Sequence, residues 1–578
     1  MSCGTMKHIP AAAEGDGGET SLVIDSQKVR TYGSAGARAR AFVPAAAWCI
    51  LVVELCERMA FYTIAGSQEF FLEHLGFPLG RAGGLNATMW TLCSVLTVFA
   101  SWIADVVLGR YLTILASGVL YVIGTLVAAL GAVPGNESAA WYLVGVMGFL
   151  PIATAGIKSN ISNLGADQYD TSDPDQKAAQ ESFFSIFYCS INLGALVAFG
   201  FFTTFASSGG LGVPKAWGYT AAYGAMSVCM LIAVVIFVSS RRRYRLSPVQ
   251  RRSALASLLG RLGALASERR CKMALSVCGG LVLLVVSIVL SVVKTLVPDG
   301  GNLVMVIAFG TAALGTLAVV APCVETSWVL PSPAETSREE HQEVEDVRAF
   351  LAMVPPLFLG SLAFNAVYNA MQFWYQQQAC QMDVRLPFGS SSFQLSGSFF
   401  NIADCLAIIV ATPLIVAVLE PAMERASRRP LGHSGKFIIG MSIASASVGL
   451  AALLEIKRRM APSLGVVSNC APNGVGMSDM SGAWITGPYF LMGIAEMYTQ
   501  PTLLHLAYAH SPPSMRTLAM SASFFIAAVS SAIFALLVVV LGPFVPNDLN
   551  AGHLEYGYYI TILIGFFFLS LFLKALRE

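Results

Sequence analysis

A succession of apolar segments, each long enough to cross a lipid bilayer, constrains the fold of this chain more than any other feature. A helix needs about 20 apolar residues to span the hydrocarbon core. The composition agrees, because 55% of the 578 residues are hydrophobic and 12% are charged, about half the charge of a soluble protein. The predicted spans, about fourteen, are 42–66, 84–107, 111–133, 140–158, 183–204, 218–238, 273–294, 302–322, 349–374, 393–418, 435–456, 484–508, 517–541 and 556–575.

These spans predict an all-α integral membrane protein with two groups of six helices and two extra helices between them. A polar, Gly/Ala/Ser-rich segment precedes the first span and shows no secretory signal pattern. The predicted domains are a disordered cytosolic tail (1–40), a six-helix bundle (41–238), a basic cytosolic linker with the spans 273–294 and 302–322 (239–348), and a second six-helix bundle (349–578).

The basic loops predict the orientation of the chain. Segment 241–272 holds ten arginines and lysines against one acid, Glu268, and such segments remain in the cytosol. With it inside, both termini are cytosolic, and so are Arg428, Arg429 and Lys436. The sequon that begins at Asn136 then lies outside, whereas the basic run 457–459 becomes an exception to the rule. Either the plasma membrane or an endomembrane fits this pattern.

Three ionisable residues interrupt the first span: Glu54, Glu57 and Arg58. A charged side chain at mid-membrane costs roughly 2.5 to 3.5 kcal/mol in lipid, so these residues are expected to face protein or water. On a helix they share one side with Phe61, and Glu54 and Arg58 have the favourable i,i+4 order for an ion pair. The sequence therefore predicts a polar cluster on one face of the first helix.

Many helices with a buried polar cluster are typical of transporters, which hold substrates between two helical bundles. An intramembrane enzyme would be expected to show a metal-ligand motif or paired catalytic acids, and the chain has no such metal motif. A channel would use rings of charge from identical subunits. The twelve cysteines are scattered, and their spacing indicates neither a metal site nor a disulfide framework. We therefore predict a transporter, not an enzyme.

Several motifs extend this prediction. They are Glu54-x-x-Glu57-Arg58, WIADVVLGRY at 102–111, GIKSNISNLGADQYD at 156–170, FFSIFYCSINLGAL at 183–196, LEIKRR at 454–459, YFLMGIAE at 489–496 and LNAGHLEY at 549–556. Together they resemble the proton-dependent oligopeptide transporter family, including its plant nitrate and peptide branch, within the major facilitator superfamily. Only the tail and the linker 239–348 lie outside the resemblance. The family fold is two six-helix bundles, and some members add two helices between them, which are expected to pack peripherally here.

The resemblance also implies roles for individual residues. Glu54, Glu57 and Arg58 would couple protons to transport, and Arg58 would contact a substrate carboxylate with Lys158 nearby. Glu496 would pair with Lys158 or hold a peptide amino terminus, which makes both residues part of the gate as well as of the substrate site. Further expected substrate contacts are Tyr62, Asn192, Tyr368 and Asn401, and the expected loop gate is Asp105 and Arg110.

The chain departs from the family pattern at several positions. Tyr368 replaces the histidine of the nitrate-transporting pattern, and Asn369 replaces an acid of some peptide transporters. Asp404 stands where an asparagine is usual, which adds an acid that we expect to take part in proton coupling. Val95 replaces a tyrosine. His505 lies where the family often has an acid, and packing is the simpler expectation for it than titration.

The predicted function is a proton-coupled symporter that imports di- or tripeptides by alternating access, with protons as coupling ion and no other cofactor. One alternative is transport of nitrate or another small anion on the same fold, and the other is a transceptor that senses ligand with little flux. The expected partners are small peptides or small anions and membrane lipid, not nucleic acid. The sequence leaves the oligomeric state open.

Overall fold

The structure is a computed structural model, and its described part is almost entirely helical. It describes residues 44–170, 173–246, 249, 254–267, 272–297, 302–329, 338–386, 393–411, 414–415, 418, 420–427, 432–472, 474–509, 511–512 and 515–576. The predicted tail 1–40, together with Arg428 and Arg429, lies outside these residues.

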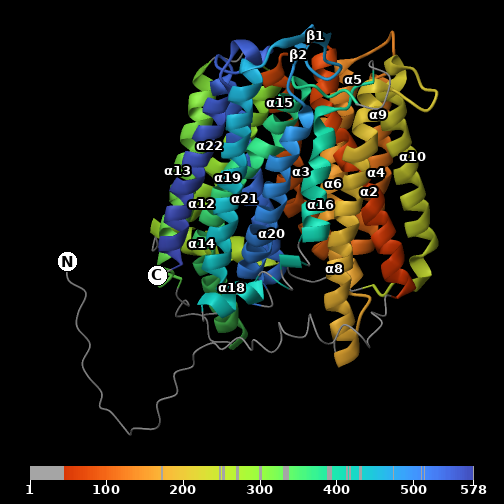
Figure 1. Ribbon diagram of the computed structural model, residues 1–578. Coiled ribbons are helices and arrows are strands. Elements are labelled where there is room, and N and C mark those ends of the chain that lie inside the picture. The colour runs from red at the N-terminus through yellow and green to blue at the C-terminus, as the bar shows by residue number, and fades with distance from the viewer. Residues whose placement is uncertain are drawn as a thin grey trace. The chain divides into compact units, whose positions relative to one another are not determined.

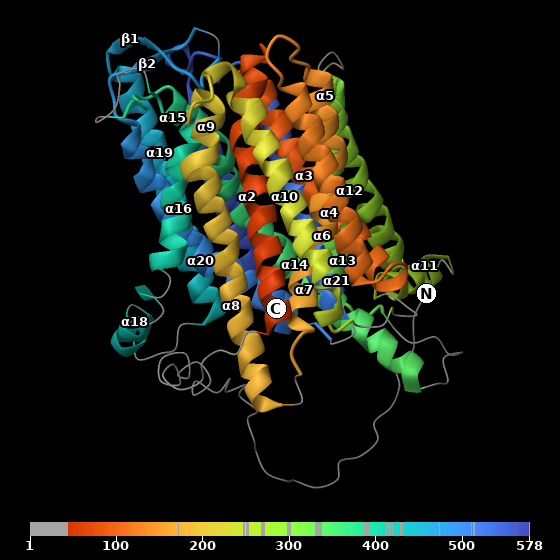
Figure 2. The same cartoon turned by 90° about the vertical axis from the view of Figure 1, so that its right-hand side faces the viewer.

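The first half of the protein, residues 44–246, forms a helical bundle (Figures 1 and 2). Its core is continuous and is contributed by all of the long helices of this half. The elements are α2 (Ala45–His74), α3 (Leu79–Val106), α4 (Arg110–Gly131), α5 (Ala139–Leu143), η1 (Val144–Phe149), α6 (Leu150–Lys158), α7 (Ile161–Ala166), α8 (Pro174–Val197), η2 (Ala198–Phe202), α9 (Thr203–Ser208), η3 (Lys215–Trp217), α10 (Gly218–Ser239) and η4 (Arg241–Arg243).

The second half, residues 338–576, forms another bundle, and the linker between the halves contributes three helices. The linker helices are α11 (Ala254–Ser267), α12 (Lys272–Leu296) and α13 (Asn302–Val324). The second half contains α14 (Arg338–Ala370), η5 (Met371–Tyr375), α15 (Gln376–Cys380), η6 (Gly397–Asn401), α16 (Ile402–Leu406), η7 (Ala407–Ala411), α18 (Glu420–Ser427), α19 (His433–Met460), β1 (Ser463–Val467), β2 (Gly476–Ser478), η9 (Gly482–Ile485), α20 (Thr486–Ala509), α21 (Arg516–Leu541), η11 (Leu549–Ala551) and α22 (Leu554–Ala575).

Within the described residues, eleven helices are long and apolar enough to cross a membrane. The other three predicted spans correspond to α2, to the shorter apolar segment Gly397–Ala411 and to α20. Helix α2 packs against α8 and α10, and α20 packs against α16 and α19, so both lie among the spanning helices. The predicted all-α membrane fold is confirmed.

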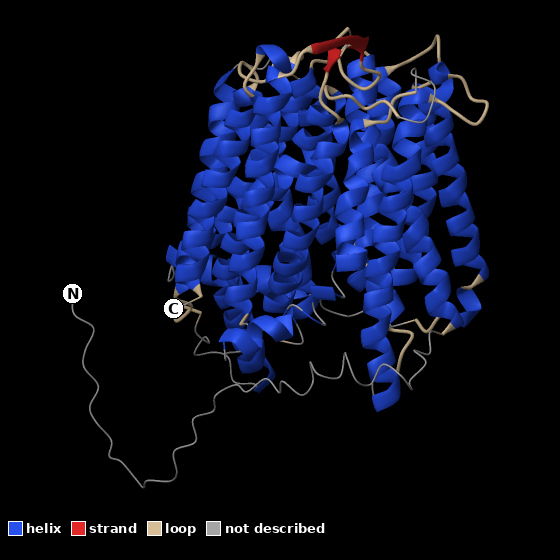
Figure 3. Cartoon of the chain, viewed as in Figure 1, coloured by secondary structure: helices blue, strands red, loops and turns tan. Residues whose placement is uncertain are grey.

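The two ends of the bundle differ in chemistry. Strands β1 and β2 pair antiparallel, with Ser463 opposite Ser478 and Val467 opposite Gly476, and they lie at one end, which we call the hairpin end (Figure 3). Helix α10 begins near the hairpin end and runs to the opposite end, where it is followed by Arg241–Arg243. We call this opposite end the basic end. Helix α22 also ends there, close to the C-terminus (Figure 1).

Four helices of the two bundles contain short π-helical turns. Among the described residues, these are η1 in the span 140–158, η2 in the span 183–204, η5 at the end of the span 349–374 and η7 in the span 393–418. Such turns carry one extra residue in the backbone ladder and often occur at functional sites. Here η5 follows Tyr368 by a few residues, and η7 begins three residues after Asp404. The irregular backbone therefore lies beside residues that the sequence nominates.

The two extra helices, α12 and α13, pack against each other, and α12 also contacts both halves. Thr88 of α3 donates a hydrogen bond to Thr295 of α12 over 3.0 Å, and Ser291 of α12 donates one to the carbonyl of Ala532 in α21 over 3.0 Å. Helix α12 thus covers the seam between α3 and α21. The two helices thus pack against the outside of the bundles, as expected.

A disulfide at the hairpin end corrects the sequence analysis. Cys380 at the end of α15 is bonded to Cys470, which lies in the loop between β1 and β2, 90 residues later. Scattered spacing concealed this pair because the two positions meet only in the folded chain. In the same region Asp383 accepts two hydrogen bonds from the Arg385 guanidinium, which hold the pKa of Asp383 below its usual value.

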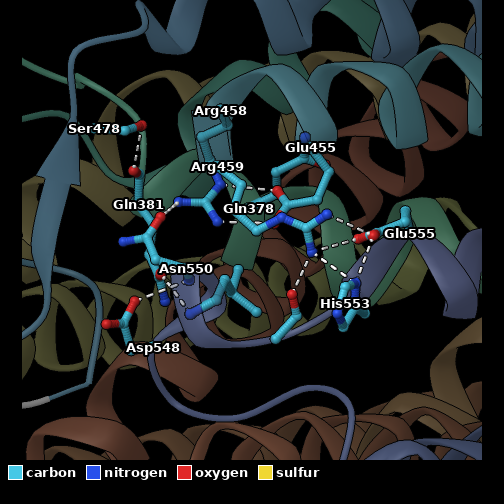
Figure 4. A network of polar contacts seen from close by, with 12 residues as sticks. Gln378, Gln381, Glu455, Arg458, Arg459, Ser478, Asp548, Asn550, His553 and Glu555 are labelled. Carbon is cyan, nitrogen blue, oxygen red and sulfur yellow. Dashed lines mark hydrogen bonds and ion pairs between the residues drawn. The ribbon is translucent and has the colours of Figure 1, made fainter. Parts of the chain in front are cut away.

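A second polar network at this end explains the basic run 457–459 (Figure 4). Arg458 is fully buried and donates to both carboxylate oxygens of Glu455 over 2.8 Å, and to Asn550 over 2.9 Å. Arg459 forms an ion pair with Glu555 at 2.7 Å. Because acids neutralise Arg458 and Arg459, these two charges of the run do not count as free loop charges of the kind that sets orientation.

Most of the described hydrogen bonds between the two halves lie near the hairpin end. Ser208 of α9 donates to the carbonyl of Gln394 over 2.6 Å, and the Ser396 amide donates to Thr204 over 3.1 Å. The Leu79 amide donates to Asn547 over 2.8 Å. Toward the basic end, the described residues show one such bond, from Ser521 to Ser101 over 3.2 Å. The described hydrogen bonds between the halves are therefore concentrated at the hairpin end, whereas α3 and α21 also pack against each other toward the basic end.

Candidate functional site

The predicted polar cluster on the first helix is present and is almost completely buried. Arg58 Nε lies 3.0 Å from Glu54 Oε1, and Arg58 Nη2 lies 2.5 Å from Glu57 Oε2. The exposed fractions of Glu54, Glu57 and Arg58 are 2%, 0% and 5%. One guanidinium thus bridges two carboxylates of its own helix, as the i,i+4 and i,i+1 spacings allow. The expectation that these charges face protein and form an ion pair is confirmed.

Helix α8 packs against this cluster through a glycine. A Cβ atom on Gly194 would lie 2.8 Å from the Leu55 carbonyl oxygen and 2.9 Å from Arg58 Cβ. The absence of a side chain lets α8 approach the α2 backbone at the turn that carries Arg58. Asn192, 6% exposed, then lies beside the site, but its amide donates to the Tyr188 carbonyl over 3.0 Å. Its predicted contact with a substrate backbone stays a prediction.

Lys158, at the end of α6, supplies a second cation to the first half. It is half-buried and acts electrostatically on both Glu54 and Glu57. Its Nζ atom lies 4.5 Å from the centre of the Phe524 ring in α21. The cluster therefore carries two acids and two bases. Through Lys158, a cation of the first half contacts helix α21 of the second half.

Two acids occupy the facing part of the second half. Asp404 of α16 and Glu496 of α20 interact electrostatically with each other, and Asp404 is 7% exposed. Close packing fixes Asp404, because a Cβ on Gly493 would lie 3.0 Å from its Oδ1 atom. The hydroxyls of Tyr188 and Tyr368 act electrostatically on the Glu496 carboxylate. Tyrosines from both halves thus surround an acid pair.

The predicted pair between Lys158 and Glu496 is not formed in this structure. Among the described residues, Lys158 Nζ lies over the Phe524 ring, and Glu496 interacts electrostatically with Tyr188 and Tyr368. The loop-gate prediction is altered in a similar way, because Arg110 forms its ion pair with Asp167 at 2.5 Å. Asp105 feels the charge of Arg110 but has no ion pair in the described part of the chain. The gating roles stay predictions.

The remaining predicted site residues surround these charges. The Tyr62 ring packs 5.4 Å from Phe61 and 5.4 Å from Phe199, between α2 and η2. Asn401 precedes Asp404 by one turn, and its Oδ1 atom is buried without a hydrogen-bond donor among the described residues. Asn369 is 4% exposed. Outside the cluster, Val95 is partly buried and His505 is exposed, and the role expected for His505 stays a prediction.

The chemistry of the site is that of two opposed charge sets. The first half offers Arg58 and Lys158, which suit a carboxylate or another anion. The second half offers Asp404 and Glu496 and, within the described residues, no cation that forms an ion pair with either. A zwitterion fits such an arrangement with its negative end toward α2 and its positive end toward α20. Among the described residues, no cluster of His, Cys, Asp or Glu could hold a metal ion.

Sequence reasoning missed two buried acids on α2, Glu69 and Glu73, with exposed fractions of 0% and 3%. The first span was predicted to end at residue 66, whereas α2 continues to His74. Both acids therefore appeared to belong to a loop. Their i,i+4 spacing within a continued apolar pattern, QEFFLEHL at 68–75, was the signal that could have identified them.

Comparison with known proteins agrees with the fold. A family model described as the POT family matches residues 111–543. The protein NRT1/PTR family 8.3 of Arabidopsis thaliana is 26% identical over 88% of this chain and 87% of its own length. The structure of an auto-inhibited POT family peptide transporter superposes with a TM-score of 0.69 at 20% identity, covering 92% of this chain and 96% of that one. A POT family transporter in complex with 5-aminolevulinic acid gives 0.63 at 20% identity, covering 92% and 97%.

Proposed function

Because the chain belongs to the POT family of membrane transporters, we propose that it is a proton-coupled symporter that imports di- and tripeptides by alternating access. The observation that carries this proposal is the opposition of charge between the halves. Arg58 and its two glutamates lie on α2, and the acids Asp404 and Glu496 lie on the second half. A peptide with free termini presents the complementary charges at its two ends.

In this proposal Arg58 is shared between the substrate and the two glutamates of α2. When a substrate carboxylate binds Arg58, the ion pairs with Glu54 and Glu57 weaken. A buried carboxylate without a partner is costly, by several kcal/mol, so the freed glutamate takes up a proton. Substrate binding and proton binding thus favour each other, which is the thermodynamic requirement for symport.

The opposed charges also supply a gate. We propose that Lys158 and Glu496 approach each other when the halves close toward the basic end, and that the present structure, joined at the hairpin end, is the form that opens to the cytosol. Asp105 and Arg110 would join the loop contacts that change between these forms. The basic linker then lies in the cytosol, together with both termini.

The disulfide between Cys380 and Cys470 supports this orientation independently of the basic loops. Disulfides form in oxidising compartments and are rare in the cytosol. The bond lies at the hairpin end, opposite Arg241–Arg243. The hairpin end would therefore face the cell exterior or an organelle lumen, and the exposed sequon residue Asn136 lies at the same end.

Transport of nitrate or another small anion on the same fold is the second candidate, since Arg58 and Lys158 are suited to an anion. The acids Asp404 and Glu496 oppose it, because either of them, whenever it is ionised, repels an anion that approaches from the second half. A transceptor with little flux would show the same binding site without net uptake. These alternatives differ in measurable flux, so transport experiments separate them.

The test is uptake of a labelled dipeptide into proteoliposomes with an imposed inward proton gradient, with nitrate as competitor. We expect concentrative dipeptide uptake that a protonophore abolishes. Glu54→Gln and Glu57→Gln should lose concentrative uptake while retaining exchange. The matched control is Glu345→Gln, an acid at the basic end whose side chain is 62% exposed.

Three results would contradict the proposal in different ways. Accumulation against the gradient by either glutamine variant would remove Glu54 or Glu57 from the coupling mechanism. Proton-driven nitrate uptake without dipeptide flux would assign the protein to the anion candidate. Dipeptide binding without any net uptake would favour the transceptor.

A further inference from the structure

A second group of buried acids lies on α2 well away from the site described above. Glu69 and Glu73 are one helical turn apart and therefore share a face of the helix. Eleven residues separate Arg58 from Glu69, which corresponds to about 16 Å along a helix axis. The pair lies toward the hairpin end, where the two halves are joined, and has no role in the mechanism proposed so far.

Glu69 is held between three helices by neutral amides. Its Oε1 atom accepts a hydrogen bond from Asn86 Nδ2 of α3 over 2.8 Å. Its Oε2 atom accepts one from Gln377 Nε2 of α15 over 3.1 Å. Since α2 and α3 belong to the first half and α15 to the second, this carboxylate is part of the contact that closes the hairpin end.

The surroundings of the pair contain unused acceptors. Glu73 Oε1, Asn86 Oδ1 and Gln377 Oε1 are buried and have no hydrogen-bond partner among the described residues. The residues that carry them are between 1% and 3% exposed. Asn86 and Gln377 already direct their amide nitrogens at Glu69, so their oxygens lie in the same cluster. Against these three acceptors stands, in the described part of the chain, one unused donor near Glu69, Gln376 Nε2, so acceptors outnumber donors and a hydrogen on one carboxyl would find a partner.

Within the described residues, no cation neutralises the pair. The titratable groups of other helices that interact electrostatically with the pair are Tyr219 of α10, with Glu73, and Tyr489 of α20, with Glu69.

Two bases on the same helices, His74 of α2 and Arg81 of α3, have other partners. His74 lies 3.8 Å from Glu137, and the Arg81 guanidinium lies 4.7 Å from the centre of the Phe77 ring and donates to the Leu296 carbonyl. Neither base forms an ion pair with Glu69 or Glu73 in the described residues.

Two ionised carboxylates this close, buried and without a cation, would each incur a penalty of several kcal/mol, and their mutual repulsion adds to it. We propose that Glu69 and Glu73 form a second proton-binding site, occupied when the two halves close at the hairpin end. The inference rests on the proposed alternating access, but it does not depend on the identity of the substrate.

The mechanism follows from the contact with Gln377. When the halves separate at the hairpin end, Gln377 leaves Glu69, water reaches both carboxylates, and they exchange protons with the outer compartment. Closure removes the water, and a proton retained by one carboxyl donates to one of the unused oxygens. Proton concentration on the outer side would thus favour closure there, which is the step that commits a bound substrate to entry.

The test compares Glu69→Gln, Glu73→Gln and the double variant with wild type. The control is Glu137→Gln, an acid at the same end whose side chain is 33% exposed. Infrared difference spectra of the purified protein, recorded between two pH values without substrate, report protonated carboxyl groups directly. We expect the double variant to lose one protonated carboxyl band that the wild type and the control both show. At least one single variant should lose the same band.

A transport measurement completes the test. In proteoliposomes, the dependence of substrate exchange on outer pH should flatten in the variant that loses the band, and it should be unchanged in Glu137→Gln. An unchanged infrared spectrum in the double variant, with native tryptophan fluorescence showing that it is folded, would overturn the inference. So would a band that sodium ions displace at constant pH, because the pair would then bind a metal cation rather than a proton.

Because the spectra require no substrate, an absence of dipeptide transport by the wild type would refute the proposed function and leave this inference open to its own measurement.

Discussion

Replacing Gly194 by alanine tests whether close approach of α8 to α2 supports the charged cluster. The added Cβ would lie 2.8 Å from the Leu55 carbonyl oxygen, 2.9 Å from Arg58 Cβ and 3.0 Å from the Met59 amide nitrogen. Two of these atoms belong to the α2 backbone, so no single side chain can move to make room. The helices must separate, by several tenths of an ångström or more.

Overpacking of this kind typically costs 1–3 kcal/mol, whereas alanine gains about 0.5–1 kcal/mol over glycine inside a helix. We therefore expect Gly194→Ala to lower the free energy of unfolding by up to about 2.5 kcal/mol. Gly224→Ala in α10 is the matched control, because its Cβ would meet nothing within 4 Å. That variant should be neutral or slightly more stable.

The free energies can be measured by unfolding the purified protein in mixed detergent micelles and following tryptophan fluorescence. Dipeptide uptake provides the functional measurement, and we expect a raised KM for Gly194→Ala because Asn192 and Tyr188 shift relative to Arg58. If Gly194→Ala matches Gly224→Ala in both stability and uptake, the proposed role of this helix contact is wrong.

Three further predictions concern the second half. Arg458→Met leaves the buried carboxylate of Glu455 without a cation and should cost about 3–5 kcal/mol in unfolding free energy; adding Glu455→Gln should recover most of it, as a double-mutant cycle would show. Replacing Cys380 and Cys470 by serine opens a 90-residue loop and should lower the unfolding free energy by at most about 4–5 kcal/mol. Each single serine variant should lose as much as the double variant, and a reducing agent should lower the unfolding free energy of the wild type but not of the variants. Asp404→Asn removes one of two acids, so lysine-containing dipeptides should compete with the labelled dipeptide about tenfold more weakly, or by about 1.4 kcal/mol, while neutral dipeptides compete as before. An equal loss of competition for both kinds of dipeptide would contradict a charge effect.

The predicted helices were largely correct because the bilayer imposes one strong local rule, that a span must be long and apolar. The rule fails where a long helix carries polar residues that other helices bury. Helix α2 was predicted to end at residue 66 because Gln68, Glu69 and Glu73 interrupt the apolar run, yet the helix continues to His74. Neighbouring helices bury these polar residues, and burial by other protein segments leaves no signature in a local window.

The contents of the charged cluster could also be read locally. Glu54, Glu57 and Arg58 lie on one helix, so helical spacing alone predicts which side chains meet. Resemblance to a known family identified Lys158 and Glu496 as site residues, but it did not predict that they are unpaired with each other in this conformation. A contact between two halves depends on which end of the bundle is closed, and a single sequence encodes every state of the transport cycle.

What the sequence determined by itself is the membrane-spanning helical architecture and the cluster on α2, because periodicity and hydrophobic length act over a few turns of one helix. The tertiary structure decided everything that joins distant segments. It placed Gln377 beside Glu69, bonded Cys380 to Cys470, and set Asp404 beside Glu496. These partners are separated by tens to hundreds of residues along the chain, and only packing of the whole bundle brings them within reach of one another.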